Sequence, residues 1–386
     1  MDIKIFTNNI EGKAKHQVYE LAKLDVFKDS KIRIMPDVHA GAGCVIGFTA
    51  DLGNKVIPNV VGVDIGCGMY TVPLGNVEID FKLIDTFIND NIPSGREVNE
   101  DIQVYYEKEI MDLHCLKEIG KTPYEYNLAI GSLGGGNHFI EIAEDENKSK
   151  FLIIHSGSRN MGYRVAKHYQ NLAIKYHKDN DNVDIIKQLK KEGRHKEIQN
   201  VLKSQTKINM PKELAYLETE LREMYLHDMA ICQKYAEQNR VTMADKIMFK
   251  LGLYGIKGFQ TIHNYIDFED NIVRKGAIKA DKGTVVLIPI NMRDGSILAI
   301  GKGNDDWNNS APHGAGRLMS RRQAKDELSL KEYQDTMKDV YSTSVDINTL
   351  DEAPMAYKSM QEILDNIGDT VDVISILKPV YNFKAN

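Results

Sequence analysis

Short apolar runs separated by glycine-rich turns dominate the first 80 residues of the chain, a pattern typical of β-strands joined by tight connections. The expected strands of this region are KIRIMP, GCVIGFTA, NVVGVDIG and MYTVPLG. Similar runs return much later as FLIIH and GTVVLIPI. These segments predict a β-sheet core assembled from distant parts of the chain.

The middle of the chain has a helical period instead. Residues 183–202 are charged and helical in pattern, and from Pro211 onward we expect another helix. Its apolar side chains recur at helical spacing as Leu214, Leu217, Leu221, Met224 and Tyr225. Amphipathic helices that pack on the strand core explain this pattern, so no catalytic residue is expected here.

Composition describes a soluble globular protein, because 386 residues with 42% hydrophobic content can bury a substantial core. The first residues contain no apolar stretch that follows basic ones, so they do not resemble a secretory signal. No segment approaches the roughly 20 apolar residues that span a bilayer. The four cysteines are too few and scattered for a disulfide framework. We therefore expect a cytoplasmic protein without a membrane partner.

The net charge of −6 argues mildly against a protein that coats nucleic acid non-specifically, since such proteins usually carry a strong basic excess. A local basic groove remains compatible with this charge. Lys302, Arg317, Arg321 and Arg322 lie near His313 in the sequence and are candidates for such a groove.

Candidate metal ligands stand in several separated glycine-rich segments. Because they come from such distant parts of the chain, they suggest a catalytic metal site and not a small zinc module. Their mixture of nitrogen, oxygen and sulfur suits Mn, Zn, Co or Fe better than Mg or Ca. The candidates are Asp64, Cys67, His138, His155 and His263.

Each candidate taken alone has a plainer interpretation. Cys67 would more often be a small buried core residue, and a lone histidine at a strand end, such as His138 or His155, is usually structural. His263 has the weakest local context. The remaining histidines are expected to be surface or packing residues: His16, His114, His168, His177, His195 and His227.

Two further segments carry candidate chemistry. Asp37 and His39 stand two apart in MPDVHAGAG, where a structural role, with Asp37 capping a turn and His39 buried, is as good an interpretation as a functional one. His313 precedes the stretch GAGR, whose flexible main chain can wrap phosphate oxygens while Arg317 neutralises their charge. His313 is therefore either a nucleophile or one more metal ligand.

Nine motifs, in the same order and across nearly the whole chain, resemble the RtcB family of RNA-splicing ligases. They are PDVHAGAG, GVDIGCGM, SLGGGNHFIEI, HSGSR, HNY, RKGA, GKGN, HGAGRLMSR and EAPMAYK. The resemblance implies an α+β fold, with one catalytic domain over residues 1–386 that has a central β-sheet core and flanking helices. Residues from about 160 to 260 would form a largely helical insertion.

The resemblance also implies an activity, the GTP-dependent joining of RNA 3′-phosphate or 2′,3′-cyclic phosphate ends to 5′-hydroxyl ends. His313 matches the histidine that becomes guanylylated, and the five metal candidates match ligands of two Mn2+ ions, with Cys67 bridging. The RNA would be broken or intron-processed tRNA, and an activating protein partner is possible within the family. Positions expected to hold GTP are Asn137, Glu141, Asn291, Gly314, Ala315, Gly316, Tyr357 and Lys384; those expected to contact substrate or support the site are Asp37, His39, Arg159 and Arg317.

The chain departs from the family pattern in IPINMRDGS, where the family has small residues after IP. Asn291 and its neighbours would change the nucleotide contact, and Arg293 can add a phosphate contact in compensation. This suggests a divergent branch, for RNA repair or tRNA splicing. The alternatives are a metal-dependent RNA-end phosphatase or cyclic phosphodiesterase, and a non-catalytic RNA-binding relative.

Overall fold

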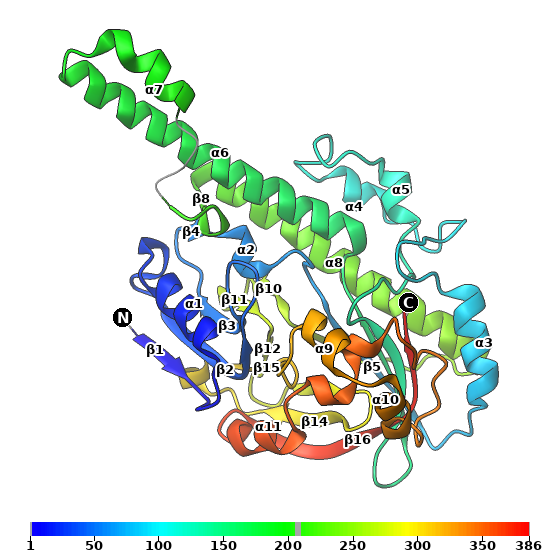
Figure 1. Ribbon diagram of the computed structural model, residues 1–386. Coiled ribbons are helices and arrows are strands. Elements are labelled where there is room, and N and C mark those ends of the chain that lie inside the picture. The colour runs from blue at the N-terminus through cyan, green and yellow to red at the C-terminus, as the bar shows by residue number, and fades with distance from the viewer. Residues whose placement is uncertain (1, 205–209, 386) are drawn as a thin grey trace.

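Two β-sheets form the centre of the molecule in a computed structural model that describes residues 2–204 and 210–385 (Figure 1). The five-stranded sheet has the order β1-β2-β3-β11-β10, and the seven-stranded sheet has the order β13-β14-β16-β6-β7-β5-β9. Two small ribbons, β12-β15 and β4-β8, complete the pairing in the described residues. β1 and β2 run parallel, and the other pairs are antiparallel.

The strands are β1 (Asp2–Ile5), β2 (Lys31–His39), β3 (Ile46–Asp51), β4 (Lys55–Val56), β5 (Gly68–Gly75), β6 (Phe139–Glu144), β7 (Lys150–Ser156), β8 (Leu217–Glu218), β9 (Phe259–Ile262), β10 (Asn264–Asp267), β11 (Ile272–Lys275), β12 (Ala277–Lys279), β13 (Val285–Asn291), β14 (Gly295–Gly301), β15 (Ser310–Pro312) and β16 (Val371–Lys384). The α-helices are α1 (Gly12–Ala22), α2 (Pro58–Val61), α3 (Phe81–Asn91), α4 (Glu107–Met111), α5 (Pro123–Asn127), α6 (Arg159–Lys191), α7 (Ile198–Ser204), α8 (Thr219–Lys250), α9 (Arg321–Glu327), α10 (Leu330–Thr336) and α11 (Met360–Ile367). Short 3₁₀ helices are η1 (Asp25–Phe27), η2 (His195–Glu197), η3 (Lys212–Leu214), η4 (Asp305–Trp307), η5 (Leu350–Glu352) and η6 (Pro354–Ala356).

Helices α3 and α8 cover one face of the seven-stranded sheet. Ile84 and Ile88 of α3 are fully buried there, one helical turn apart, and pack in one cluster with Ile247 of α8 and Ile140 of β6. Burying each such side chain stabilises the fold by about 1.5–3 kcal/mol. Asp80 fixes the start of α3, because its carboxylate accepts the backbone N–H of Leu83 at 3.1 Å. The helical layer thus holds the strands that carry the site.

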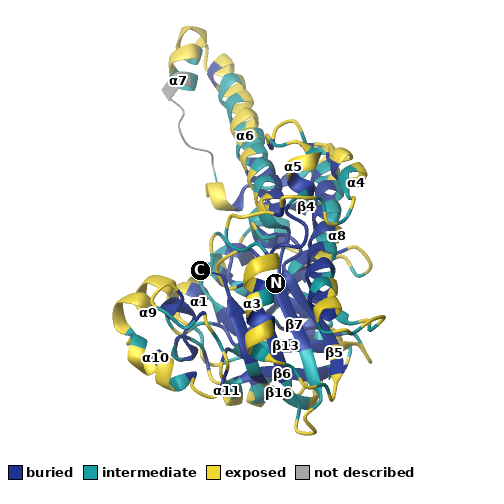
Figure 2. Ribbon diagram, turned by 90° about the vertical axis from the view of Figure 1, so that its right-hand side faces the viewer, coloured by how far each residue is buried: buried dark blue, intermediate teal, exposed yellow. Residues whose placement is uncertain are grey.

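The two longest helices, α6 and α8, pack against each other, but α6 runs beyond the body of the protein (Figure 1). Its buried residues lie mostly between Met161 and Ala173, and Leu189 is buried further along. Figure 2 shows the far part of α6, together with α7, mainly as exposed and intermediate surface. Among the described residues, neither these helices nor any other is apolar enough over its length to cross a membrane.

The predicted α+β class is confirmed, and so are the strands expected in KIRIMP, GCVIGFTA, MYTVPLG, FLIIH and GTVVLIPI. The strand expected in NVVGVDIG is wrong. Pro58 occupies the first turn of α2, where its missing N–H costs nothing, and Gly62 ends this helix with φ 101°. The segment therefore forms a helical turn and a loop, and Asp64 lies in that loop.

The helix expected from Pro211 begins only at Thr219. Leu214 lies in η3, and Leu217 lies in β8, where it pairs with Val56. Each leucine is buried, so the apolar spacing runs through a 3₁₀ helix, a strand and then α8. The helical pattern over 183–202 is confirmed except at the break around Gly193, whose φ of 75° ends α6. The single domain with an insertion over 160–260 stays a prediction.

Candidate active site

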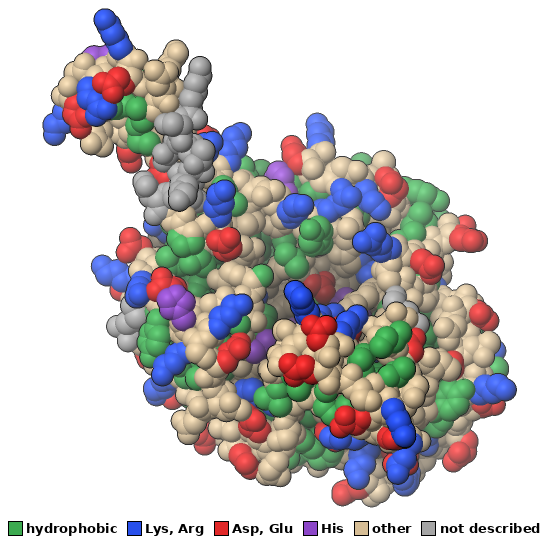
Figure 3. All heavy atoms as spheres, in the orientation of Figure 1, with side chains coloured by type: hydrophobic (Ala, Val, Ile, Leu, Met, Phe, Trp, Pro, Cys, Tyr) green, Lys and Arg blue, Asp and Glu red, His purple; other side chains and the backbone are tan. Residues whose placement is uncertain are grey.

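A cavity of about 330 Å³ collects most of the predicted site residues. Figure 3 shows the molecule hollowed near the middle of this face, with Lys and Arg side chains beside the hollow. His138 and Asp37 stand behind the wall of the cavity, in contact with residues that line it. The predicted residues that line it are His39, Asp64, Cys67, Asn137, Glu141, His155, His263, Asn291, His313, Gly314, Ala315, Gly316, Arg317, Tyr357 and Lys384.

Cys67 lies at the centre of the five predicted metal ligands. Its Sγ is 3.2 Å from Nε2 of His155 and 3.5 Å from Nε2 of His138. The Nε2 of His138 is also 3.0 Å from Oδ2 of Asp64. The ring of His263 follows on the other side, 5.1 Å from that of His155. Thiol, imidazole and carboxylate atoms therefore converge from the loop before β5, from β7, from the position before β6 and from the position between β9 and β10.

The outer ring nitrogens show which atoms are free to bind a cation. Nδ1 of His138 donates to the Leu133 carbonyl at 2.9 Å, and Nδ1 of His155 donates to the Asn137 carbonyl at 3.1 Å. Because a carbonyl only accepts, both rings must present Nε2 as a lone pair toward Cys67. Nδ1 of His263 is buried with no hydrogen-bond partner among the described residues. An orphaned imidazole nitrogen beside a thiol fits a metal ligand.

Burial controls the ionisation of this cluster. It lowers the pKa of His155 and of His263 well below the ordinary value, so both imidazoles are neutral, as a metal ligand must be. Burial, followed by the nearby Asp64 carboxylate, raises the pKa of Cys67 well above that of a free thiol. A divalent cation at Sγ would offset both effects and stabilise the thiolate.

Two glycines make the close approach of these segments possible. A Cβ on Gly157 would lie 2.0 Å from Oδ1 of Asp64, so glycine after the HS of the HSGSR motif makes room for the carboxylate. A Cβ on Gly68 would lie 2.6 Å from the Thr261 carbonyl of β9. The β5–β9 pairing brings His263 next to Cys67, whose carbonyl accepts the His263 N–H at 2.9 Å.

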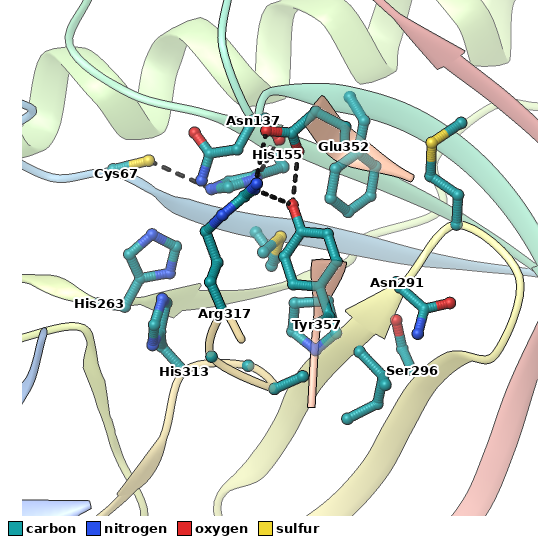
Figure 4. A pocket seen from close by; sticks show the side chains of 18 of the residues that line it. Cys67, Asn137, His155, His263, Asn291, Ser296, His313, Arg317, Glu352 and Tyr357 are labelled. Atoms are coloured by element: carbon teal, nitrogen blue, oxygen red, sulfur yellow. Dashed lines mark hydrogen bonds and ion pairs between the residues drawn. The ribbon is translucent and has the colours of Figure 1, made fainter. Parts of the chain in front are cut away.

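His313 directly follows β15 and is held by Asp37 of β2. Oδ2 of Asp37 lies 2.6 Å from Nδ1 of His313 and accepts its backbone N–H at 3.1 Å. Asp37 is fully buried. The His313 ring is 4.9 Å from that of His263, so it borders the metal cluster (Figure 4). His39 lines the cavity and donates its Nδ1 proton to the Asp37 carbonyl at 2.9 Å.

A network of opposite charges forms another wall of the cavity (Figure 4). Glu352, 3% exposed, accepts the Tyr357 hydroxyl at 2.7 Å and pairs with Lys384 at 3.1 Å. Arg317 donates to the same hydroxyl at 3.0 Å, and its guanidinium lies 4.9 Å from the centre of the Tyr357 ring. Arg321 approaches Glu352 at 3.3 Å. The sequence reasoning missed Glu352, although it is the first residue of the EAPMAYK motif.

Glu141 faces the cavity from β6, opposite Asn382 of β16. Its Oε2 accepts the Asn382 side-chain amide at 2.8 Å. Burial raises the pKa of Glu141 to about 8, so the side chain is protonated at neutral pH and can donate a hydrogen bond. No sequence motif pointed to Asn382, which lies opposite Glu141 because of the β6–β16 register.

The divergent segment lines the cavity with Ile290 and Asn291, at the end of β13. Oδ1 of Asn291 accepts the backbone N–H of Arg293 at 3.0 Å and of Asp294 at 2.8 Å, which closes the turn. Arg293 pairs with Asp294 at 2.7 Å and does not line the cavity. The phosphate contact expected from Arg293 stays a prediction.

Three other basic candidates also lie off the cavity. Lys302 pairs with Asp372 at 3.0 Å, and Arg322 approaches Asp326 at 3.6 Å with its side chain 93% exposed. Arg159 stands behind the cluster, where its Nε donates to the Ser132 hydroxyl at 2.9 Å, and does not line the cavity. The basic groove reduces to Arg317, Arg321 and Lys384 at the cavity wall.

Sequence comparisons agree with this geometry. The model of the family described as tRNA-splicing ligase RtcB matches residues 17–123 and 117–385. The chain is 30% identical to the RNA-splicing ligase RtcB of Escherichia coli strain K12, covering 99% of this chain and 97% of that protein. It is also similar to the RNA-splicing ligase RtcB2 of a second E. coli strain, at 26% identity over 97% of this chain and 93% of that protein. The tRNA-splicing ligase RtcB of Aeropyrum pernix is 26% identical over 86% of this chain and 82% of its own length. The chain therefore belongs to the RtcB family.

Proposed function

We propose that this protein is a GTP-dependent RNA ligase that joins 3′-phosphate or 2′,3′-cyclic phosphate ends to 5′-hydroxyl ends through a guanylylated His313. The observation that carries the proposal is the pairing of His313 with buried Asp37 at 2.6 Å, beside a cluster of cysteine and histidine ligands. A histidine held in this way is a nucleophile in the arrangement used for covalent catalysis.

Asp37 determines which nitrogen of His313 reacts. Because Nδ1–H donates to the carboxylate, Nε2 keeps the lone pair that would attack the α-phosphorus of GTP. A P–N bond forms, the bond to the bridging oxygen breaks, and pyrophosphate leaves. The ring then carries positive charge until it releases its proton, and the adjacent Asp37 carboxylate stabilises that charge.

Asp64, Cys67, His138, His155 and His263 would hold the two Mn2+ ions that we propose, because their sulfur, nitrogen and oxygen donors suit this metal. When bound, these ions would neutralise charge on the phosphates and activate an oxygen nucleophile. His138 and His155 are kept in the ligand tautomer by their carbonyl partners, whatever the metal.

Other cavity residues supply recognition. Asn137, protonated Glu141, Asn291, Tyr357 and Lys384 offer hydrogen bonds to the nucleotide, and the Gly314–Gly316 main chain can approach phosphate. Arg317 and Arg321 would neutralise the RNA 3′-phosphate, which takes GMP from His313. Attack by the 5′-hydroxyl then forms the phosphodiester bond and expels GMP. Broken or intron-processed tRNA is the RNA that we propose.

Covalent labelling with [α-32P]GTP tests this function. The protein should acquire an acid-labile, alkali-stable label in Mn2+, Co2+ or Zn2+, and His313→Ala should lose it. His16→Ala, which removes an exposed histidine of α1, is the matched control and should label normally. Turnover that stops after one guanylylation would favour the activating protein partner that the family resemblance implies.

Absence of label in all three metals would overturn the ligase proposal. Release of phosphate from an RNA 3′ end, or opening of a cyclic phosphate, would then identify a metal-dependent phosphoesterase. RNA binding without either reaction would identify a non-catalytic relative.

A further inference from the structure

A second cluster of histidine and aspartate lies outside the cavity, where the segment after α4 meets α8. Asp112 and His114 come from that segment, and His227 and Asp228 come from α8. Ligand-type atoms of His114, His227 and Asp228 lie within 4.8 Å of one another, and the two imidazole rings are 4.6 Å apart. None of these four residues lines the active-site cavity.

Asp228 is the fixed part of this cluster. It is fully buried, and its Oδ1 accepts the His114 backbone N–H at 2.8 Å. Its Oδ2 accepts the Cys115 backbone N–H at 3.0 Å and the Tyr169 hydroxyl of α6 at 2.8 Å. With Nδ1 of His227 at 3.1 Å from Oδ1, the carboxylate has four donors for its four lone pairs. It therefore serves best as an anchor for the His227 ring.

The anchor leaves the opposite nitrogen of His227 in an unusual position. Nδ1–H donates to Asp228, and Nε2, the other ring nitrogen, lies 3.2 Å from Oδ2 of Asp112. Two acceptors at that distance repel each other unless a proton or a metal cation lies between them. A carboxylate that holds the outer nitrogen of a histidine is the usual partner of a metal-binding imidazole.

We propose that His227, His114 and Asp112 form a binding site for a divalent transition metal of the Zn2+ class, with Asp228 orienting His227. Two imidazoles and one carboxylate suit zinc, and water can complete a tetrahedral shell. The two carboxylates together carry a charge of −2, which a bound divalent cation would balance. The His114 ring is exposed and the Asp112 side chain is 74% exposed, so both can turn toward Nε2 of His227. Metal there would fasten the segment after α4 to α8.

Zinc counting on the full-length protein tests this site. After equilibrium dialysis against Zn2+, elemental analysis should find one equivalent fewer in His114→Ala than in the wild-type protein. His16→Ala should keep the wild-type number, and both variants should retain labelling of His313 by GTP. An equal zinc content in wild type and His114→Ala, or the same loss in His16→Ala, would overturn the proposal.

Thermal shift separates this site from the active-site cluster. Cys67→Ala removes the central ligand of that cluster, yet Zn2+ should still raise the Tm of this variant. Adding His114→Ala or Asp112→Asn to it should abolish the rise. If the rise persists in both double variants, the site does not exist, whatever the outcome of the GTP labelling. His227→Gln, which keeps a side-chain amide facing Asp228, should behave as His114→Ala does.

Discussion

The two ends of the active-site cavity, one around Cys67 and one around Glu352, differ in how their buried polar atoms are paired. Around Cys67 the thiol and the Nε2 atoms face one another, and Nδ1 of His263 lacks a partner within the described chain. Around Glu352 each buried charge already meets an opposite one, since Lys384, Arg317 and Arg321 surround a single carboxylate. The first end presents donor atoms to a cation, whereas at the second end the carboxylate already has cationic partners.

This difference predicts which protein contacts a metal or a phosphate must replace when it binds. A metal at the Cys67 end would replace the contacts that Cys67 makes with His155 and that His138 makes with Asp64, and the same atoms would become its ligands. A phosphate at the other end must compete with Glu352 for Arg317, Arg321 and Lys384, so its binding exchanges one ion pair for another. Nucleotide and RNA phosphates would gain less affinity from these cations than three unpaired basic groups would provide.

Cys67→Ala should have the largest effect, because it removes the atom that the other ligands surround. Loss of an outer partner of a metal ligand typically lowers affinity or activity about 10- to 100-fold, so loss of the central ligand should lower guanylylation about 10³-fold or more. Mn2+ binding followed by electron paramagnetic resonance should weaken in parallel. Cys44→Ala, at a buried thiol outside the cavity, is the matched control. Normal metal binding in Cys67→Ala would refute the assignment of this end.

Glu352→Gln should destabilise the folded protein, because it leaves the cations at the Glu352 end of the cavity without a counter-charge. Removing one partner of a buried ion pair costs about 3–5 kcal/mol, and because glutamine preserves the shape we expect about 3 kcal/mol. Urea unfolding measures this loss. Asp326→Asn, at a carboxylate paired with exposed Arg322, should change stability by less than about 1 kcal/mol.

Added phosphate sharpens that experiment. Anions should restore part of the stability of Glu352→Gln, because they can replace the lost carboxylate, but they should leave Asp326→Asn unchanged. A wild-type free energy of unfolding in Glu352→Gln would show that the network is not the stabilising element described here.

Asp37→Asn tests the role of the carboxylate that holds His313 beside the metal cluster. The amide keeps the size of the side chain but loses the charge that stabilises a positively charged His313 ring, so guanylylation should slow about 10²-fold. Mn2+ affinity should not change, because Asp37 touches none of the metal candidates through its side chain. Rapid-quench labelling measures the rate. A parallel loss of Mn2+ binding would mean that His313 acts as a metal ligand instead of a nucleophile.

The candidate metal ligands could be chosen from the sequence by residue type, but only the fold shows which of them lie close together. Cys67 and His155 are separated by 88 positions and meet at 3.2 Å because β5 and β7 are paired. Residue type and glycine-rich context made both of them candidates. Glu352 and Asn382 were missed because an ordinary carboxylate and an ordinary amide become functional only through their neighbours.

Local patterns explain other features that the sequence analysis did not predict. The Asn291 side chain accepts the backbone N–H groups two and three positions further on, which makes an Asx-type turn, and Arg293 within this turn pairs with Asp294. The early start predicted for α8 failed because pairing with β4 demanded a strand at Leu217, and apolar spacing alone could not separate the two. The α+β class was predicted from the family resemblance, and the apolar runs, most of which became strands, agree with it.

Glu141 differs from the charged groups at the Glu352 end of the cavity, because we expect it to be protonated and neutral. Burial raises the pKa from 4.5 to about 8 in the folded protein, so the folded state keeps a proton that the unfolded chain loses above its ordinary pKa. The stability that this proton provides is complete below about pH 4.5, falls as the pH rises toward 8, and then levels off.

Glu141→Gln cannot ionise, so between pH 6 and pH 8 it should lose about 2 kcal/mol less stability than the wild-type protein. Urea unfolding at the two pH values measures this, with Glu146→Gln, at an exposed position in the same hairpin, as the control that keeps the wild-type slope. Identical slopes for Glu141→Gln and wild type would mean that Lys384 keeps Glu141 ionised, and the cavity would then present one more charge pair to the nucleotide where we expect a neutral hydrogen-bond donor.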